Sequence, residues 1–233
     1  NIINNGTGVV TLLVNGASGS RTFLTGTNTH TGGTIVSGGI LEIGSVGALG
    51  TSGTVTLVEN SGATLGFSGG ITFNRALASV AGLGEDNFGA IRSLSGINNL
   101  TAQITQSSPS FLAADAGATL NITASTPATS AITGTQNLTL GGEGTVNVTG
   151  RIAIGTGILN KAGIGLVTLS GDNNFTGATN IMAGTLRLDR ATALGIATST
   201  TPIVTISAGA TLDLNGQAIE NRNFSINGVG FSG

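Results

Sequence analysis

Short segments that alternate apolar and polar residues occur along most of the chain. Thr145-Val-Asn-Val148, Thr185-Leu-Arg-Leu188 and Ile203-Val-Thr-Ile206 are three of them. A period of two with many β-branched residues predicts short strands that each bury one face. Gly, Asn-Gly and Ser-Gly steps separate the segments and are typical of tight turns. No stretch of ten or more residues has helical periodicity with a cap, so the pattern predicts an all-β chain.

The chain also repeats itself. Residues 24–50 align with residues 169–195 without a gap, at an offset of 145. The matching positions include Gly26 with Gly171, Asn28 with Asn173, Thr31-Gly32 with Thr176-Gly177, and Ala48-Leu-Gly50 with Ala193-Leu-Gly195. The first copy carries about a dozen extra residues within 13–23, where Asn15-Gly16 predicts a protruding turn.

A shorter Gly-Ala-Thr-Leu motif occurs three times, at 61–67, 116–122 and 208–214, so a short unit is reused inside the longer one. Self-similarity of this kind favours a solenoid over a sandwich, because each turn can stack on the next. Turns of about 20–25 residues would give about ten coils. Coils spaced about 4.8 Å apart would then make a rod of about 50 Å.

The repeats define one solenoid segment over 1–233, with repeat copies near 3–67 and 160–214 and linking coils over 68–159. The chain begins with Asn1 rather than Met and has no signal-peptide pattern. We therefore expect it to be an excerpt of a longer repeat protein.

Composition narrows the class of protein. Of 233 residues 40 are Gly, only 8% are charged, and the formal net charge is −2. The charge balance argues against a nucleic-acid or anionic-membrane partner, and no apolar run is long enough to span a bilayer as a helix. No Cys is present, which excludes disulfides and thiol chemistry, and one His cannot build a multi-His metal site.

The second copy carries a family motif. Leu159-Asn-Lys-Ala-Gly-Ile-Gly-Leu-Val-Thr-Leu-Ser-Gly-Asp-Asn-Asn-Phe-Thr-Gly177, then Ala183-Gly-Thr-Leu-Arg-Leu188 and Ala193-Leu-Gly195, resemble the autotransporter-associated β-strand repeat. Such repeats build passenger domains of bacterial autotransporters. The first copy departs from the pattern, because His30 replaces the aromatic residue, Lys is missing before Gly6, and a loop is inserted.

The resemblance implies a right-handed parallel β-helix that is extracellular or attached to the outer membrane at the cell surface. It says little about activity, because the repeat is a scaffold on which function varies. It implies no direct membrane insertion of this segment.

His30 is the single imidazole of the chain. A functional His would need an Asp, Glu or Ser partner. Because His30 stands where Phe175 stands in the second copy, we interpret it as a ring that fills a Phe position.

Glu85-Asp86 is the one adjacent carboxylate pair. We interpret the pair as a solvated turn. Because carboxylate oxygens can bind calcium, Glu85 and Asp86 are the candidate metal ligands of the alternative interpretation. No calcium-binding loop pattern accompanies them. No catalytic or cofactor-binding residue is assigned and no cofactor is expected. Asp213 and Glu220 near Arg222, and Asp189 beside Arg187 and Arg190, are interpreted as surface ion pairs.

We expect a non-enzymatic structural and adhesive rod. Its expected partners are copies of itself, by lateral or end-to-end stacking, and a host or neighbouring cell surface or matrix. The alternative is a carbohydrate-active β-helix enzyme or a phage tail-type protein, which would need acidic clusters and aromatic sugar platforms. The absence of Trp and Tyr and the scattered acidic residues argue against that alternative.

Overall fold

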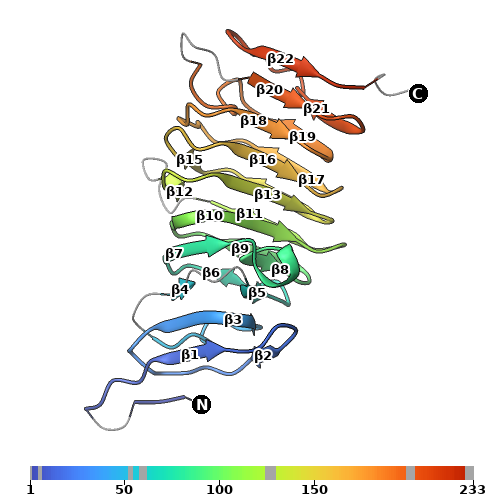
Figure 1. The fold of residues 1–233 in the computed structure, drawn as a ribbon. Coiled ribbons are helices and arrows are strands. Elements are labelled where there is room, and N and C mark those ends of the chain that lie inside the picture. The colour runs from blue at the N-terminus through green and yellow to red at the C-terminus, as the bar shows by residue number, and fades with distance from the viewer. Residues whose placement is uncertain are drawn as a thin grey trace.

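The chain is a parallel β-solenoid of about nine turns in the computed structural model, and its two ends lie at opposite ends of the rod (Figure 1). The structure describes residues 2–4, 7–51, 62–123, 130–197 and 203–228, and the backbone alone of 55–57. The predicted all-β parallel solenoid is confirmed, and the number of turns is close to the ten expected. The described residues include no helix that is long and apolar enough to cross a membrane.

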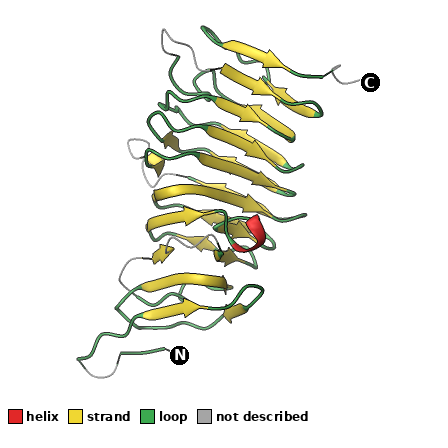
Figure 2. Cartoon of the chain, viewed as in Figure 1, coloured by secondary structure: helices red, strands yellow, loops and turns green. Residues whose placement is uncertain are grey.

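Twenty-two strands and one 3-10 helix make up the described part (Figures 1 and 2). The strands are β1 Leu12–Asn15, β2 Arg21–Leu24, β3 Thr34–Ile43, β4 Val55–Leu57, β5 Ala63–Phe67, β6 Thr72–Phe73, β7 Leu77–Gly82, β8 Ile91–Ser93, β9 Ile97–Leu100, β10 Ile104–Ala114, β11 Thr119–Ile122, β12 Ser130–Thr133, β13 Leu138–Gly142, β14 Thr145–Val148, β15 Arg151–Ala153, β16 Leu159–Ala162, β17 Leu166–Leu169, β18 Thr179–Ile181, β19 Gly184–Leu188, β20 Ile203–Ile206, β21 Ala210–Asp213 and β22 Asn223–Ile226. The helix η1, Glu85–Asn87, bulges from the side of the rod (Figure 2).

The strands form two sheets that run along the rod, and every strand pairing among the described residues is parallel. The larger sheet contains β1–β5 and the smaller ends in β21. Paired residues in neighbouring turns are as few as 19 positions apart, at Thr22 and Leu41, and as many as 28, at Ile104 and Ile132. The turns therefore vary more in length than the expected 20–25 residues.

The core is a set of inward columns that run along the rod, one side chain per turn. One column is given by the strand register as Leu41, Leu65, Ile91, Leu112, Leu140, Lys161, Ile181 and Ile206. Up to Ile181 each of these side chains is at least 99% buried. Burial of each aliphatic side chain contributes roughly 1.5–3 kcal/mol, so such columns stabilise the rod along its whole length. Lys161 is the one polar residue in this column.

Outward side chains also stack in columns. Thr72, Asn99, Asn121, Asn147 and Thr168 occupy one column of the smaller sheet. The amide of Asn121 donates to Asn99 Oδ1 at 2.8 Å, and the amide of Asn147 donates to Asn121 Oδ1 at 2.9 Å. This ladder of Thr and Asn side chains satisfies outer polar groups without charge.

Glycine is required where the chain turns from the larger to the smaller sheet. Gly142 and Gly163 both have positive φ angles, of 100° and 71°. A Cβ atom on Gly142 would lie 2.2 Å from the Ala114 carbonyl oxygen, and one on Gly163 would lie 2.3 Å from that of Gly142. Only glycine lets successive turns approach this closely at that corner.

Candidate functional site

The two repeat copies share a buried asparagine that links three turns. Asn28 Oδ1 accepts the backbone N–H of Ile2 at 2.7 Å, and Asn28 Nδ2 donates to the Ala48 carbonyl at 2.6 Å. Asn173 makes the same two bonds, to Ile152 N–H at 2.7 Å and to Ala193 O at 2.6 Å. Both side chains are buried. These two asparagines act as structural clamps between turns.

The interpretation of His30 as a core ring is confirmed. His30 and Phe175 are both fully buried, one in each copy. His30 Nε2 lies 3.4 Å from the hydroxyl of Thr34, whereas the equivalent Thr179 hydroxyl beside Phe175 has no hydrogen-bond partner within the described residues. Burial, and secondarily the positive charge of Arg75, lower the pKa of His30, so it stays neutral at physiological pH.

Lys161 forms hydrogen bonds to the corner segments of two successive turns. Its Nζ donates to the carbonyl oxygens of Gly163 at 2.7 Å, Ala183 at 2.8 Å and Ala162 at 3.1 Å. Burial lowers its pKa to about 8. The amine therefore occupies an aliphatic position in the core because three carbonyl groups of the corner satisfy its donors.

Arginine side chains bind the Ala-Leu-Gly segment of each copy, a feature that the sequence interpretation missed. Arg75 Nη1 donates to the Leu49 carbonyl and Arg222 Nη2 donates to the Leu194 carbonyl, both at 2.7 Å. The expectation that Arg222 forms a surface ion pair is therefore wrong. The signal in the sequence was an Asn-Arg pair that follows each Ala-Leu-Gly segment, at 74–75 and 221–222.

The expected surface ion pair of Asp189 with Arg187 is present, whereas Asp213 lies near Arg187 rather than pairing with Arg222. The Nε atom of Arg187 lies 3.2 Å from Asp189 Oδ1 and 4.0 Å from Asp213 Oδ2. All three side chains are well exposed, so each pair contributes little to stability.

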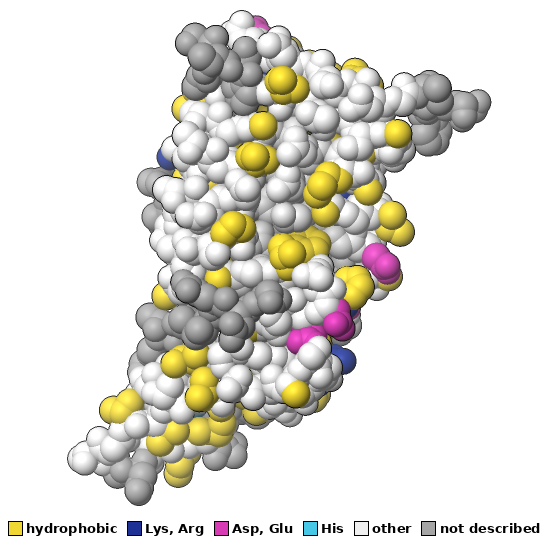
Figure 3. Space-filling view, viewed as in Figure 1, with side chains coloured by type: hydrophobic (Ala, Val, Ile, Leu, Met, Phe, Trp, Pro, Cys, Tyr) yellow, Lys and Arg dark blue, Asp and Glu magenta, His cyan; other side chains and the backbone are white. Residues whose placement is uncertain are grey.

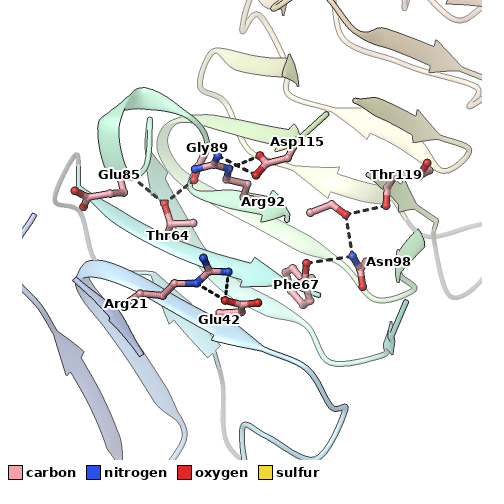
Figure 4. Close-up of polar contacts among 11 residues, drawn as sticks. Arg21, Glu42, Thr64, Phe67, Glu85, Gly89, Arg92, Asn98, Asp115 and Thr119 are labelled. Carbon is pink, nitrogen blue, oxygen red and sulfur yellow. Dashed lines mark hydrogen bonds and ion pairs between the residues drawn. The ribbon is translucent and has the colours of Figure 1, made fainter. Parts of the chain in front are cut away.

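The side chains of Glu85 and Asp86 lie in different environments, one buried and one exposed to solvent. Glu85 is buried, and its Oε1 accepts the Ser18 hydroxyl at 2.5 Å and the Gly19 N–H at 2.7 Å. Its backbone N–H donates to the hydroxyl of Thr64 (Figure 4). Asp86 is exposed. The interpretation of the pair as a solvated turn is wrong for Glu85, because this carboxylate fixes the loop inserted in the first copy.

The Glu85 side chain borders a shallow hollow of about 440 Å³ between that loop and η1. Within the described residues, no three His, Cys, Asp or Glu side chains come together in a way that could hold a metal ion. Glu85 and Asp86 are the two acidic residues that line this hollow, and Glu85 already binds the inserted loop.

A second buried carboxylate was not singled out from the sequence. Glu42 on β3 is paired with Arg21 of the preceding turn (Figure 4). It also accepts the hydroxyl of Ser68 of the following turn. Glu42 is buried, whereas Arg21 is half exposed. This carboxylate therefore links three turns, as the clamp asparagines do.

Charged and apolar side chains meet at one corner of the rod, next to η1. Arg92 Nε and Nη2 donate to the two carboxylate oxygens of Asp115 at 2.5 and 2.9 Å (Figure 4). The Arg92 guanidinium also lies 5.1 Å from the centre of the Phe88 ring. Figure 3 shows acidic and hydrophobic side chains side by side at this edge of the rod, near the middle of its length.

This corner contains a hollow of about 760 Å³, which we call the corner groove. It is lined by Asn87, Phe88, Arg92, Leu94, Phe111, Ala114, Asp115, Ala116, Gly142, Glu143, Ala162, Gly163 and Ile164. These residues come from four successive turns, so the groove follows the rod axis. Its volume lies within the range of ligand sites in proteins, which is about 300–1,000 Å³. The corner groove is the candidate binding site.

Comparisons with known proteins agree with the repeat pattern. The family model described as the passenger-associated-transport-repeat matches residues 3–43 and 159–188. The chain is 32% identical over 228 residues to the BmaC adhesin autotransporter of Brucella suis biovar 1 (strain 1330). The alignment covers 97% of this chain and 6% of that relative, so the chain spans a small part of its length. No solved structure matches the chain.

Proposed function

We propose that this chain, which belongs to the passenger domains of bacterial autotransporters, is an adhesive module displayed at the cell surface or secreted from it. The observation that carries the proposal is the similarity to an adhesin along almost the whole chain. The rod architecture agrees with it, because stacked turns hold surface features away from a cell.

The chain acts by binding rather than by catalysis in this proposal. Support comes from the carboxylates of Glu42, Glu85 and Asp115, each of which bonds to side chains or backbone of neighbouring turns. Such groups serve the scaffold, whereas a glycosidase would hold a pair of carboxylates toward a bound sugar.

Self-association is part of the proposal. The uncharged Thr and Asn columns do not repel a second rod, which permits lateral contact. Sedimentation velocity over a range of concentrations tests this part. A monomer at every concentration would contradict it.

We also propose that the solenoid winds right-handed. Parallel strands connected within one sheet are right-handed in about 98% of cases, because a twisted strand packs back onto its sheet in that way. An experimental density map would show the hand directly.

The adhesive function is tested by the binding of the purified, fluorescently labelled chain to cultured cells and to matrix-coated surfaces. Saturable binding above that of labelled albumin is the expected result, and binding equal to albumin would contradict the proposal. Incubation with common polysaccharides tests the enzymatic alternative. Release of reducing ends that is lost in Glu85→Gln would overturn the assignment as a non-enzyme.

A further inference from the structure

We propose that the corner groove binds an extended peptide segment of a partner protein in which an apolar side chain is flanked by Lys or Arg. This inference rests on the proposed adhesive function and names its binding surface and ligand class. Its evidence is the apolar surface of the groove, its charge, its length and the fixed shape of the η1 loop.

The groove exposes apolar side chains on both sides. Phe88 is 54% exposed and Ile164 is 76% exposed. Leu94 and the largely buried Phe111 line the same groove. Exposed apolar surface that is contiguous and bordered by polar groups is typical of an interaction site.

The loop that carries Phe88 has an unusual backbone. Asp86 and Asn87 have positive φ angles of 52° and 62°, in a region that residues other than glycine rarely adopt. Its hydrogen bonds hold this shape, because Gly89 N–H donates to Leu83 O at 2.7 Å and the buried Glu85 is anchored to the inserted loop. Strained backbone that the surroundings fix in place is concentrated at functional sites. Here it presents Phe88 to solvent.

The charges of the groove favour a cationic ligand. Arg92 is neutralised by its two bonds to Asp115, so it does not offer a free positive charge. Glu143 is exposed and forms no ion pair with the described Lys, Arg or His side chains. The exposed carboxylate of Asp86 lies on the adjacent η1 helix. The groove is therefore net negative.

The shape of the groove favours an extended segment over a compact ligand. Four turns spaced about 4.8 Å apart give a length of about 14 Å, which matches about four residues of extended chain at about 3.3 Å each. The Arg92 guanidinium covers one face of the Phe88 ring, which leaves a single aromatic face for a sugar ring to stack on. A peptide can instead pack its apolar side chain between Phe88 and Ile164 and pair its cation with Glu143.

The test is fluorescence anisotropy of the full chain with the labelled peptide acetyl-Gly-Lys-Leu-Phe-Lys-Gly-amide. We expect saturable binding that weakens at least tenfold in Phe88→Ser and in Glu143→Lys. The matched controls Phe224→Ser and Glu220→Lys remove an exposed Phe and reverse an exposed acid outside the groove, and they should bind as the unaltered chain does. Circular dichroism and the thermal midpoint verify that all four variants fold.

Three results would overturn the inference. They are no binding at millimolar peptide, equal binding of the charge-reversed peptide with Glu in place of Lys, and equal weakening in the control variants. A neutral tetrasaccharide that binds and is lost in Phe88→Ser would assign the groove to carbohydrate instead. If the labelled chain binds cells equally well with and without Phe88→Ser, the adhesive function stands and the groove is not its site.

Discussion

Asn28 and Asn173 make the same pair of hydrogen bonds in two turns of the rod, although they lie 145 positions apart in the chain. In each case the amide oxygen accepts a backbone N–H at 2.7 Å and the amide nitrogen donates to a backbone carbonyl at 2.6 Å. Each asparagine therefore connects the turn before it with the turn after it. The repeat preserves this connection even where His30 replaces Phe175.

Replacement of the second clamp tests its role in stability. Asn173→Ala leaves the Ile152 N–H and the Ala193 carbonyl without their partner in a buried position. Since each unsatisfied buried group costs about 1–3 kcal/mol, we expect the free energy of unfolding to fall by about 2–4 kcal/mol. Denaturant unfolding followed by circular dichroism measures it. The adjacent exposed Asn174→Ala is the control, and an equal loss in both variants would contradict the clamp.

Lys161 gives the unfolding free energy a particular dependence on pH. Its pKa is about 8 when folded and near 10.5 when unfolded, so unfolding takes up a proton between these values. Stability must then rise with pH across this window, by about 2–3 kcal/mol. No other side chain of the chain has its ordinary pKa within this window, because the chain has no Tyr, no Cys and no second Lys.

Lys161→Met should abolish that rise, because the Met side chain fits the aliphatic column and does not titrate. The measurement is the denaturation midpoint at pH values from 7.5 to 10.5 for both proteins. A flat profile in the unaltered chain, or the same rise in the variant, would show that Lys161 carries its proton equally in both states.

His30 affects the free energy of unfolding at acidic pH. Burial lowers its folded pKa below 6.5, so the unfolded state binds the proton more readily as the pH falls. The free energy of unfolding should therefore decrease from about pH 7 toward pH 5. His30→Phe, which copies the second repeat, should flatten this decrease. Thermal melts at pH 7.5, 6.5 and 5.5 test it, and parallel curves for the two proteins would count against a neutral buried His30.

Glu85 holds the inserted loop in place. Glu85→Gln removes the negative charge that accepts the Ser18 hydroxyl and the Gly19 N–H. Because charge-assisted bonds are about twice as strong as neutral ones, the Gly19 amide should exchange with deuterium faster in the variant. The exposed Asp86→Asn is the matched control and should leave this rate unchanged. An unaltered Gly19 rate in Glu85→Gln would show that the loop is fixed by other contacts.

Much of the fold was predictable because its cause lies in local patterns. Alternation of apolar and polar residues determines the strands, and the repeat determines their stacking, so the parallel solenoid and the core position of His30 follow. The register that sets turn length was not predictable, since the turn of 19 residues contains no strand of the smaller sheet, whereas the turn of 28 residues includes β11.

The candidate site was harder to foresee. Glu85 is adjacent to Asp86, but its burial depends on a loop 66 residues earlier that folds over it. The corner groove joins Phe88 to Ile164 through four turns of unequal length, so no spacing in the sequence reveals it. Arg222 was misassigned for the same reason, because its carbonyl partner at Leu194 lies one turn away.

Adhesion itself is measured most directly by the retention of coated beads on a cell layer under flow. Beads that carry the folded chain should remain attached at shear that removes albumin-coated beads, and soluble chain added in excess should release them. Retention equal to that of albumin beads, or retention unchanged by soluble chain, would contradict a role for this rod in adhesion.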